Sequence, residues 1–259
     1  MHQSLLKYPL KSHRKVVTLP QESGQLAELI GIIYGDGSIG NSWQVIISLN
    51  SITYAEYAKY IQSLMLSLFE LEARLRKRPN QNTLVVVLTS TTAVDFLVEK
   101  GAVRGNKLIN TEGIPSWILA NQDYERFFVR GIVDTDGCLY FHTHFVNGKK
   151  YVNIGLCFTN YSPKLILEIS SILESFQIRA HITDRGRRIY LYRKKDIEKY
   201  LEEFGTSNAR IIRKYKEWRS RIVVYSTRLE SAQAKAYAGS NPASSALEQE
   251  KSDTKKKEQ

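Results

Sequence analysis

The sequence is poor in the features that would mark a secreted or membrane protein. It contains only two cysteines, Cys138 and Cys157, which excludes a disulfide framework and a zinc site built from cysteines. No apolar run approaches the roughly 20 residues that a membrane-spanning helix needs. The first residues, 1–19, have no uninterrupted apolar core, which excludes a secretory signal. We therefore expect an intracellular protein without a membrane partner, in the cytoplasm or nucleoid, or in an organelle matrix in a eukaryote.

Acidic residues are scarce relative to basic ones. The 259 residues include 37 Lys and Arg but only 26 Asp and Glu, which gives a formal net charge of +11. Residues 221–259 hold little of this excess, so the positive charge belongs to the folded part. Such a charge favours a polyanionic partner, with an ordinary basic protein as the alternative.

One short stretch occurs twice. Leu29–Gly37 reads LIGIIYGDG, and Val129–Gly137 reads VRGIVDTDG. Each is an apolar run that carries a glycine and ends in a small residue followed by Asp-Gly. The two aspartates, Asp36 and Asp136, lie 100 residues apart.

The elements around these stretches repeat in the order αββαββα. Apolar periodicity and turn residues predict helices at 25–34, 53–70 and 92–100, then at 122–133, 160–176 and 195–204. They predict strands at 43–49, 73–77 and 84–88, then at 139–145, 151–158, 178–183 and 188–192. Asn147-Gly148 is a strong signal for a hairpin turn.

This order predicts an α+β fold with two pseudo-symmetric repeats, each built on an antiparallel sheet. We expect a basic lead-in at 1–22, a first repeat at 23–102 and a linker at 103–121. The second repeat is expected at 122–220, and residues 221–259 form a charged tail that is predicted to be partly disordered.

The position of the two aspartates is unfavourable for a helix. A carboxylate at a helix C-terminus faces the negative end of the macrodipole, at a cost of roughly 0.3–1 kcal/mol. A single Asp-Gly is usually a turn, but two at repeat-related positions indicate function. Repulsion between Asp36 and Asp136 would be relieved by a hard divalent cation.

Small residues explain how the aspartates could meet. Gly31 and Gly35 share one helix face, and Gly131 and Thr135 match them, so these four residues are the expected interface between the two helices. Tyr34 and Asp134 are expected in or near that interface rather than at a metal.

These motifs and their spacing resemble the paired signature of LAGLIDADG homing endonucleases in the single-chain, two-repeat form. The resemblance covers roughly residues 24–215 and implies saddle-shaped sheets on DNA, with the signature helices packed at the centre. It implies a divalent metal, Mg²⁺ or Mn²⁺, at Asp36, Asp136, Gly35 and Thr135, with Ca²⁺ binding without supporting cleavage. It also implies a catalytic lysine at Lys107, with Arg210 as its repeat partner; a surface cation is the alternative for both.

The predicted strands alternate basic or aromatic with apolar residues, as expected for sheets that lie on duplex DNA. A solvated sheet face is the alternative, and metal binding is a second one for His142 and His144. The candidate DNA contacts are Gln44, Arg74, Arg76, Arg78, Tyr140, His142, His144, Lys149, Lys150, Arg179, His181, Arg185, Arg188, Tyr190 and Tyr192.

The resemblance implies a monomer that cuts both strands of a long, asymmetric site and leaves short 3′ overhangs. The sequence neither starts with Cys or Ser nor ends in His-Asn, so we expect an intron-encoded protein rather than an intein. Two alternatives remain open: a maturase that binds intron RNA, and a regulator that binds DNA without cutting it.

Overall fold

The computed structural model describes residues 17–107 and 113–221. The predicted lead-in at 1–22, the linker at 103–121 and the tail at 221–259 therefore lie partly outside the described residues. The described residues up to Tyr215, 17–107 and 113–215, belong to one compact unit, and the short described part of the second unit, 216–221, is helical. No helix in the described parts of the chain is long and apolar enough to span a bilayer.

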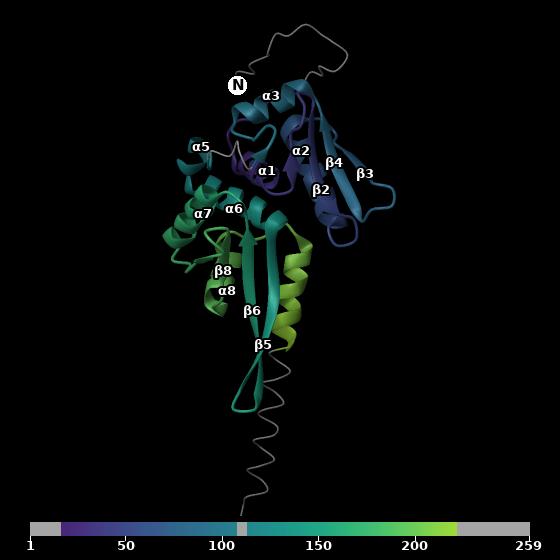
Figure 1. The fold of residues 1–259 in the computed structure, drawn as a ribbon. Helices are drawn as coiled ribbons and strands as arrows, with labels where there is room; N and C mark the ends of the chain where they lie inside the picture. Colours follow the sequence, from purple (N-terminus) through teal and green to yellow (C-terminus); the bar gives the residue numbers. More distant parts are fainter. Residues whose placement is uncertain (1–16, 108–112, 222–259) are drawn as a thin grey trace, which may run out of the picture. The chain divides into compact units, whose positions relative to one another are not determined.

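Two repeats of the same order make up the first unit (Figure 1). The first contains α1 (Gly24–Tyr34), β1 (Gly37–Ser38), β2 (Gln44–Asn50), α2 (Ala55–Phe69), β3 (Arg74–Lys77), β4 (Thr83–Thr89) and α3 (Thr91–Glu99). The second contains α6 (Gln122–Asp136), β5 (Gly137–Val146), β6 (Lys149–Thr159), α7 (Pro163–Ser175), β7 (His181–Thr183), β8 (Arg188–Leu191) and α8 (Lys194–Glu203). A short helix, α5 (Ser116–Leu119), lies in the predicted linker.

Each repeat forms a four-stranded antiparallel sheet with the same strand order. The orders are β1-β2-β4-β3 and β5-β6-β8-β7, which confirms the predicted α+β fold with two αββαββα repeats. Alternation along β2 places Val45, Ile47 and Leu49 inside and leaves the residues between them partly exposed. One face of this sheet therefore belongs to the core and the other can meet a ligand.

The longer hairpin of the second repeat follows from its turn. Asn147 and Gly148 have φ values of 49° and 74°, the conformation of a tight two-residue turn that matches the strand twist. Strands β5 and β6 consequently pair without interruption from Gly137 with Phe158 to Val146 with Lys149. In the first repeat, β1 has only two residues.

Helices α1 and α6 lie side by side between the sheets (Figure 1). Ser23 caps α1 by accepting a hydrogen bond from the Leu26 amide at 3.3 Å, and every residue from Leu26 to Tyr34 is buried. Burial on all sides explains why α1, apart from Glu28, is apolar around its circumference rather than along one stripe.

One ion pair is buried where the repeats meet. Glu28 of α1 is 0 % exposed and binds the Arg130 guanidinium of α6 through two hydrogen bonds, one of 3.1 Å to Nε. The Ser207 hydroxyl donates to the same carboxylate at 2.9 Å. In the other repeat, Phe128 stands at the position of Glu28 and Ile30 at the position of Arg130. Neither carries a charge, so the ion pair breaks the symmetry of the repeats.

Candidate functional site

The two central helices touch through their glycines. A Cβ atom on Gly31 would lie 2.3 Å from the carbonyl oxygen of Phe128, and a Cβ on Gly131 would lie 2.3 Å from that of Glu28. Because residues 31 and 128 correspond to 131 and 28, the two contacts are related by the pseudo-twofold axis. Only glycine allows the backbones to approach this closely.

The close approach continues to the C-terminal ends of the helices. A Cβ on Gly35 would lie 1.9 Å from Thr135 Oγ1 and 3.5 Å from the carboxyl carbon of Asp136. Asp36 follows Gly35 directly, so the two aspartates lie at one edge of the helix pair. Helix α6 runs three residues beyond the predicted segment 122–133 and ends at Asp136-Gly137, where the helix was expected to stop.

Both carboxyl groups lie in an environment that disfavours their charge. Burial raises the pKa of Asp36 from 3.8 to about 6, although Lys107 and Arg210 oppose the change. Burial and the neighbouring charge of Asp36 raise the pKa of Asp136 from 3.8 to about 7. Two buried acids whose pKa values are both raised form a site that favours a positive charge.

Lys107 supplies one positive charge. Its ammonium donates to the carbonyl oxygens of Ile33 at 3.3 Å and Tyr34 at 3.1 Å, and to that of Gly35. These carbonyls end α1, where the helix leaves acceptors without a partner and its dipole is negative. Burial lowers the pKa of Lys107, and the charges of Asp136 and Asp36 oppose that change.

Arg210 approaches from the second repeat through different contacts. Its guanidinium donates to the Tyr54 hydroxyl at 2.6 Å and to the Gly137 carbonyl at 3.1 Å, and it lies over the Tyr54 ring. The Tyr54 hydroxyl in turn lies 3.4 Å from the Thr135 carbonyl. The carbonyl before each aspartate thus accepts a hydrogen bond, from Lys107 at Gly35 and from Tyr54 at Thr135.

Sequence reasoning missed two side chains of this site. Tyr54 reaches it from the first repeat across to α6, a contact for which local sequence gives no signal. The Asn160 amide nitrogen lies 3.5 Å from Asp136 Oδ2, and its Oδ1 accepts from the Ser162 amide. Its repeat counterpart Asn50 makes the same kind of turn, with Oδ1 accepting from the Ile52 and Thr53 amides. The matched positions of Asn50 and Asn160 could have marked the second of these residues.

The residues present fit a hard divalent cation. Two carboxylates and the carbonyls of Gly35 and Thr135 form an all-oxygen donor set at one edge of the helix pair. No group of three His, Cys, Asp or Glu side chains occurs within 17–107 and 113–221. Since Mg²⁺ usually binds one or two carboxylates and takes its other ligands from water and phosphate, two suffice.

The raised pKa of Asp36 predicts a pH-dependent stability. A carboxyl whose pKa rises from 3.8 to about 6 on folding makes the folded state bind protons more tightly, so stability is lost as the pH rises through that window. In EDTA, Asp36→Asn should therefore raise the melting temperature above about pH 6, and the gain should fade towards about pH 4. A pH series of melting curves for both proteins tests this, and a constant difference would contradict it.

Two protein-family models match the chain. Residues 26–113 match a model described as the WhiA LAGLIDADG-like domain, and residues 123–205 match a LAGLIDADG-like domain. The chain belongs to the LAGLIDADG family. Each match contains one of the two aspartates, so both halves of the site lie in LAGLIDADG repeats.

Solved LAGLIDADG structures share the fold. The homing endonuclease I-LtrWI, bound to target DNA, is 12% identical with a TM-score of 0.53, over 79% of this chain and 91% of that one. The meganuclease I-SmaMI, bound to uncleaveable DNA, is also 12% identical with a TM-score of 0.53, over 81% and 92%. None of the curated proteins compared by sequence matches the chain.

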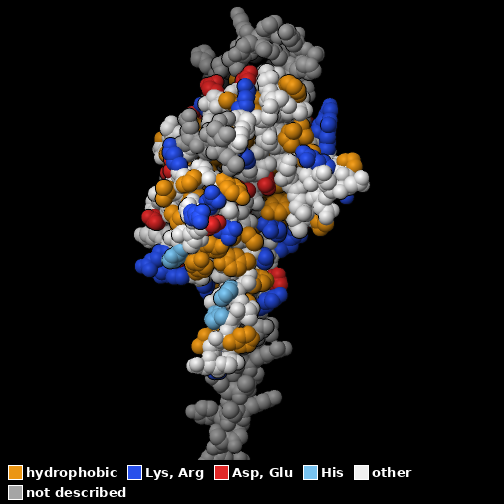
Figure 2. All heavy atoms as spheres, in the orientation of Figure 1, with side chains coloured by type: hydrophobic (Ala, Val, Ile, Leu, Met, Phe, Trp, Pro, Cys, Tyr) orange, Lys and Arg blue, Asp and Glu red, His pale blue; other side chains and the backbone are white. Residues whose placement is uncertain are grey.

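The outer faces of the two sheets differ in chemistry. In the first LAGLIDADG repeat, β3 exposes Arg74 and Arg76, Arg78 follows the strand, and Gln44 lies on β2 with its amide 3.4 Å from Thr89 Oγ1. Figure 2 shows Lys and Arg side chains over both repeats on the face in view, with His side chains near the β5–β6 hairpin.

The second repeat carries two aromatic clusters on its outer face. Tyr190 stacks on Tyr192 at 5.2 Å and meets the edge of Tyr140, and His181 lies beside Tyr192. The imidazoles of His142 and His144 stack at 5.7 Å, and Tyr151 extends that stack. The remaining predicted contacts in this repeat are Arg188 on β8, Arg185 in the exposed β7–β8 turn, and Lys149 and Lys150 at the start of β6.

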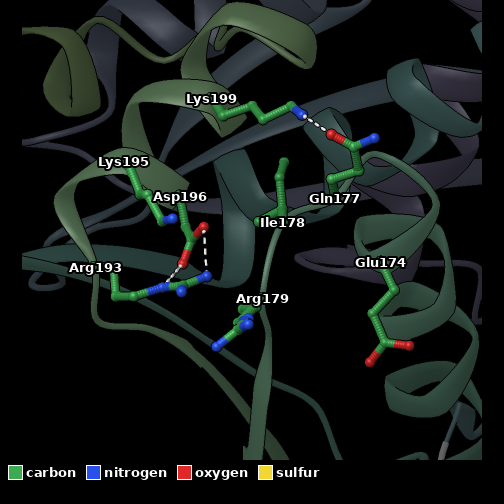
Figure 3. Close-up of a pocket in the computed structure, with 8 residues that line it drawn as sticks. All are labelled: Glu174, Gln177, Ile178, Arg179, Arg193, Lys195, Asp196 and Lys199. Atoms are coloured by element: carbon green, nitrogen blue, oxygen red, sulfur yellow. Dashed lines mark hydrogen bonds and ion pairs between the residues drawn. The ribbon is translucent and has the colours of Figure 1, made fainter.

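Arg179 lies away from the sheet face. The predicted strand at 178–183 was wrong in its start, since β7 begins at His181. Arg179 instead lines an open pocket of about 510 Å³ with residues of α7 and α8 (Figure 3). There Arg193 pairs with the buried Asp196, and Lys199 donates to Gln177 at 3.1 Å.

Proposed function

We propose that this protein is a site-specific homing endonuclease that hydrolyses both strands of a long DNA target and leaves short 3′ overhangs. One observation carries the proposal: the paired helices bring Asp36 and Asp136 together at one buried edge, with the ammonium of Lys107 bonded beside them. A protein that used the fold only as a scaffold would have no need of two buried, mutually repelling carboxyls there.

The residues of the site have separate roles in this proposal. Asp36 and Asp136, with the carbonyls of Gly35 and Thr135, hold Mg²⁺ or Mn²⁺, which when bound supplies charge at the scissile phosphate and lowers the pKa of water. The cations of Lys107 and Arg210 attract the DNA backbone to this edge and stabilise negative charge that develops on the phosphate. Asn160 orients the carboxylate of Asp136 through its amide.

The sheets supply the DNA-binding surface. Exposed arginines on β3 can form bidentate contacts with guanine in the major groove, and their phosphate contacts make the affinity depend on salt. The second sheet presents stacked tyrosines and histidines on a longer hairpin. Because the two faces differ, we propose a monomer that binds an asymmetric DNA site. We also propose that the protein is encoded within an intron.

The decisive experiment is a cleavage selection. A plasmid library of randomised duplex sites, which also includes intronless versions of candidate host genes, is incubated with the protein and Mg²⁺, and linear products are sequenced. We expect one family of long sites, cut in both strands with 3′ overhangs. Absence of cleavage at every site in Mg²⁺ and in Mn²⁺ would contradict the nuclease proposal.

The second candidate is a DNA-binding protein that does not cleave. The match of the first repeat to the WhiA LAGLIDADG-like domain rather than to a model described as an endonuclease favours it. Selection of bound duplexes in Ca²⁺, followed by transfer to Mg²⁺, separates the two candidates, because only a nuclease converts the bound duplex to product. The same selection with intron RNA in place of DNA tests the maturase alternative.

A further inference from the structure

The residue two positions before each aspartate forms side-chain hydrogen bonds that have no part in the proposed metal binding. Tyr34 and Asp134 are 100 residues apart and occupy the same place in the two signature stretches. Both are buried, with exposed fractions of 5 % and 0 %. They differ completely in chemistry, yet each is bonded to the segment that carries the basic site residue of its own repeat.

Tyr34 holds the segment that contains Lys107. Its hydroxyl lies 3.0 Å from the carbonyl oxygen of Gly101 and 2.9 Å from that of Gly113, one on each side of Lys107 along the chain. Both glycines have a positive φ, of 98° and 110°, so the chain turns sharply at the two points where it meets the tyrosine. The backbone carbonyl of Tyr34 also accepts from the Lys107 ammonium.

Asp134 holds the segment that contains Arg210. Its carboxylate accepts from the Thr206 hydroxyl and from the Ser207 amide at 2.7 Å, and its backbone carbonyl accepts from the Asn208 side chain at 2.8 Å. Asn208 Oδ1 then accepts from the Arg210 amide at 3.0 Å. The contacts run without a break from the signature helix to the arginine.

We propose that Tyr34 and Asp134 are positioning residues, each of which fixes the basic residue of its own repeat beside the paired aspartates. The inference rests on the proposed function, because it assigns Lys107 and Arg210 to the cleavage site. A phenol and a carboxylate can serve one purpose here because each ties a loop to the end of a helix that is itself rigid and buried.

The pseudo-twofold symmetry of the repeats predicts a separate effect on each DNA strand. The pseudo-twofold axis that relates the repeats also relates the two strands of a duplex bound across them. The Lys107 side chain donates to a carbonyl at the C-terminal end of α1, and the Arg210 side chain donates to the carbonyl of Gly137, which follows α6. Each basic residue therefore acts on a different DNA strand. Loss of the contacts of Tyr34 or of Asp134 should therefore slow cleavage of one DNA strand more than cleavage of the other. A general loss of stability would slow cleavage of both strands equally.

Tyr34→Phe removes the hydroxyl that meets the two carbonyls, and Asp134→Asn replaces one of the two accepting carboxylate oxygens by an amide nitrogen that cannot accept. With supercoiled plasmid and Mg²⁺, we expect each variant to accumulate nicked circles, with cleavage of one strand slowed about 10- to 100-fold. End-labelled duplex should show that the two variants slow opposite strands. DNA affinity in Ca²⁺ should stay within about twofold of wild type, because neither residue lies on the sheet faces.

Matched controls separate positioning from stability. Tyr124→Phe removes a phenol hydroxyl that likewise bonds a backbone carbonyl, that of Glu22 at 3.0 Å, but lies away from the site, so both strands should be cut at wild-type rates. Thr206→Val removes one of the two hydrogen-bond donors to the Asp134 carboxylate and should reproduce the strand preference of Asp134→Asn in a milder form. Equal slowing of both strands, or no slowing, would overturn the inference.

A second measurement tests the positioning role of Tyr34 and Asp134 even if the wild-type protein cuts no DNA. In hydrogen–deuterium exchange, Tyr34→Phe should raise exchange in residues 102–107 and leave 206–210 unchanged, and Asp134→Asn should do the reverse. Failure of wild-type cleavage would count against the proposed function alone. Unchanged exchange in both segments would count against the positioning role.

Discussion

Asp36→Asn should reduce DNA cleavage by roughly 10³-fold or more, equivalent to about 4 kcal/mol of transition-state stabilisation, and leave DNA binding intact. The change removes a negatively charged oxygen at the buried edge where the two helices end, but retains the size of the side chain. The DNA-binding sheets are untouched, so the dissociation constant in Ca²⁺ should remain within about threefold.

The measurement is single-turnover cleavage of the selected target, with binding followed by gel shift in Ca²⁺. Asp123→Asn is the matched control, because Asp123 is exposed at the start of α6, where its carboxylate pairs with Arg126. It should cut at the wild-type rate. If Asp36→Asn lost binding together with cleavage, Asp36 would be a structural residue and the proposed metal site would be wrong.

Gly31→Ala should destabilise the protein by roughly 2–3 kcal/mol. At an exposed helix position the same change gains about 1 kcal/mol of helix propensity. Here the new Cβ would lie 2.3 Å from the Phe128 carbonyl, a backbone atom that can move only if the helices separate. The steric cost exceeds the propensity gain, and separation would also part the two aspartates.

Urea denaturation of the metal-free protein measures this effect. Gly131→Ala should cost a similar amount, since its Cβ would meet the Glu28 carbonyl at the same distance. Gly40→Ala is the control, because its new methyl group would have no heavy atom within 4 Å and stability should hold or rise. Equal stability of all three variants would show that the helices can shift apart at little cost.

The parts of the fold that local sequence controls could be predicted. Helices and strands followed from apolar periodicity, and the Asn147-Gly148 turn set the longer hairpin. The equivalence of Asp36 and Asp136 followed from their similar surroundings in the two repeats. Boundaries were predicted less well: the segment 122–133 stops three residues short of the end of α6, where the Thr135 hydroxyl donates to the Ile132 carbonyl of the same helix at 2.9 Å, and β7 begins at His181 rather than at residue 178.

The site was predictable only in part, since its members meet across the repeats. The two aspartates carried a signal because their place at helix ends is unfavourable unless it serves a purpose. Tyr54 carried none, because its contacts with Arg210 and Thr135 join residues 156 and 81 positions apart. The buried pair of Glu28 and Arg130 was missed for the same reason: its members lie 102 positions apart.

That buried pair limits how such a protein can change. Leaving one member of a buried ion pair without its partner costs about 3–5 kcal/mol, a large share of the stability of an ordinary domain. The positions that replace Glu28 and Arg130 in the opposite repeat are Phe128 and Ile30, so two copies of either half would bury a charge without its counterpart. A chimaera made from halves of two different proteins would therefore have to contain both Glu28 and Arg130, or neither. For the same reason, neither repeat can lose its member of the pair while the other repeat keeps its own.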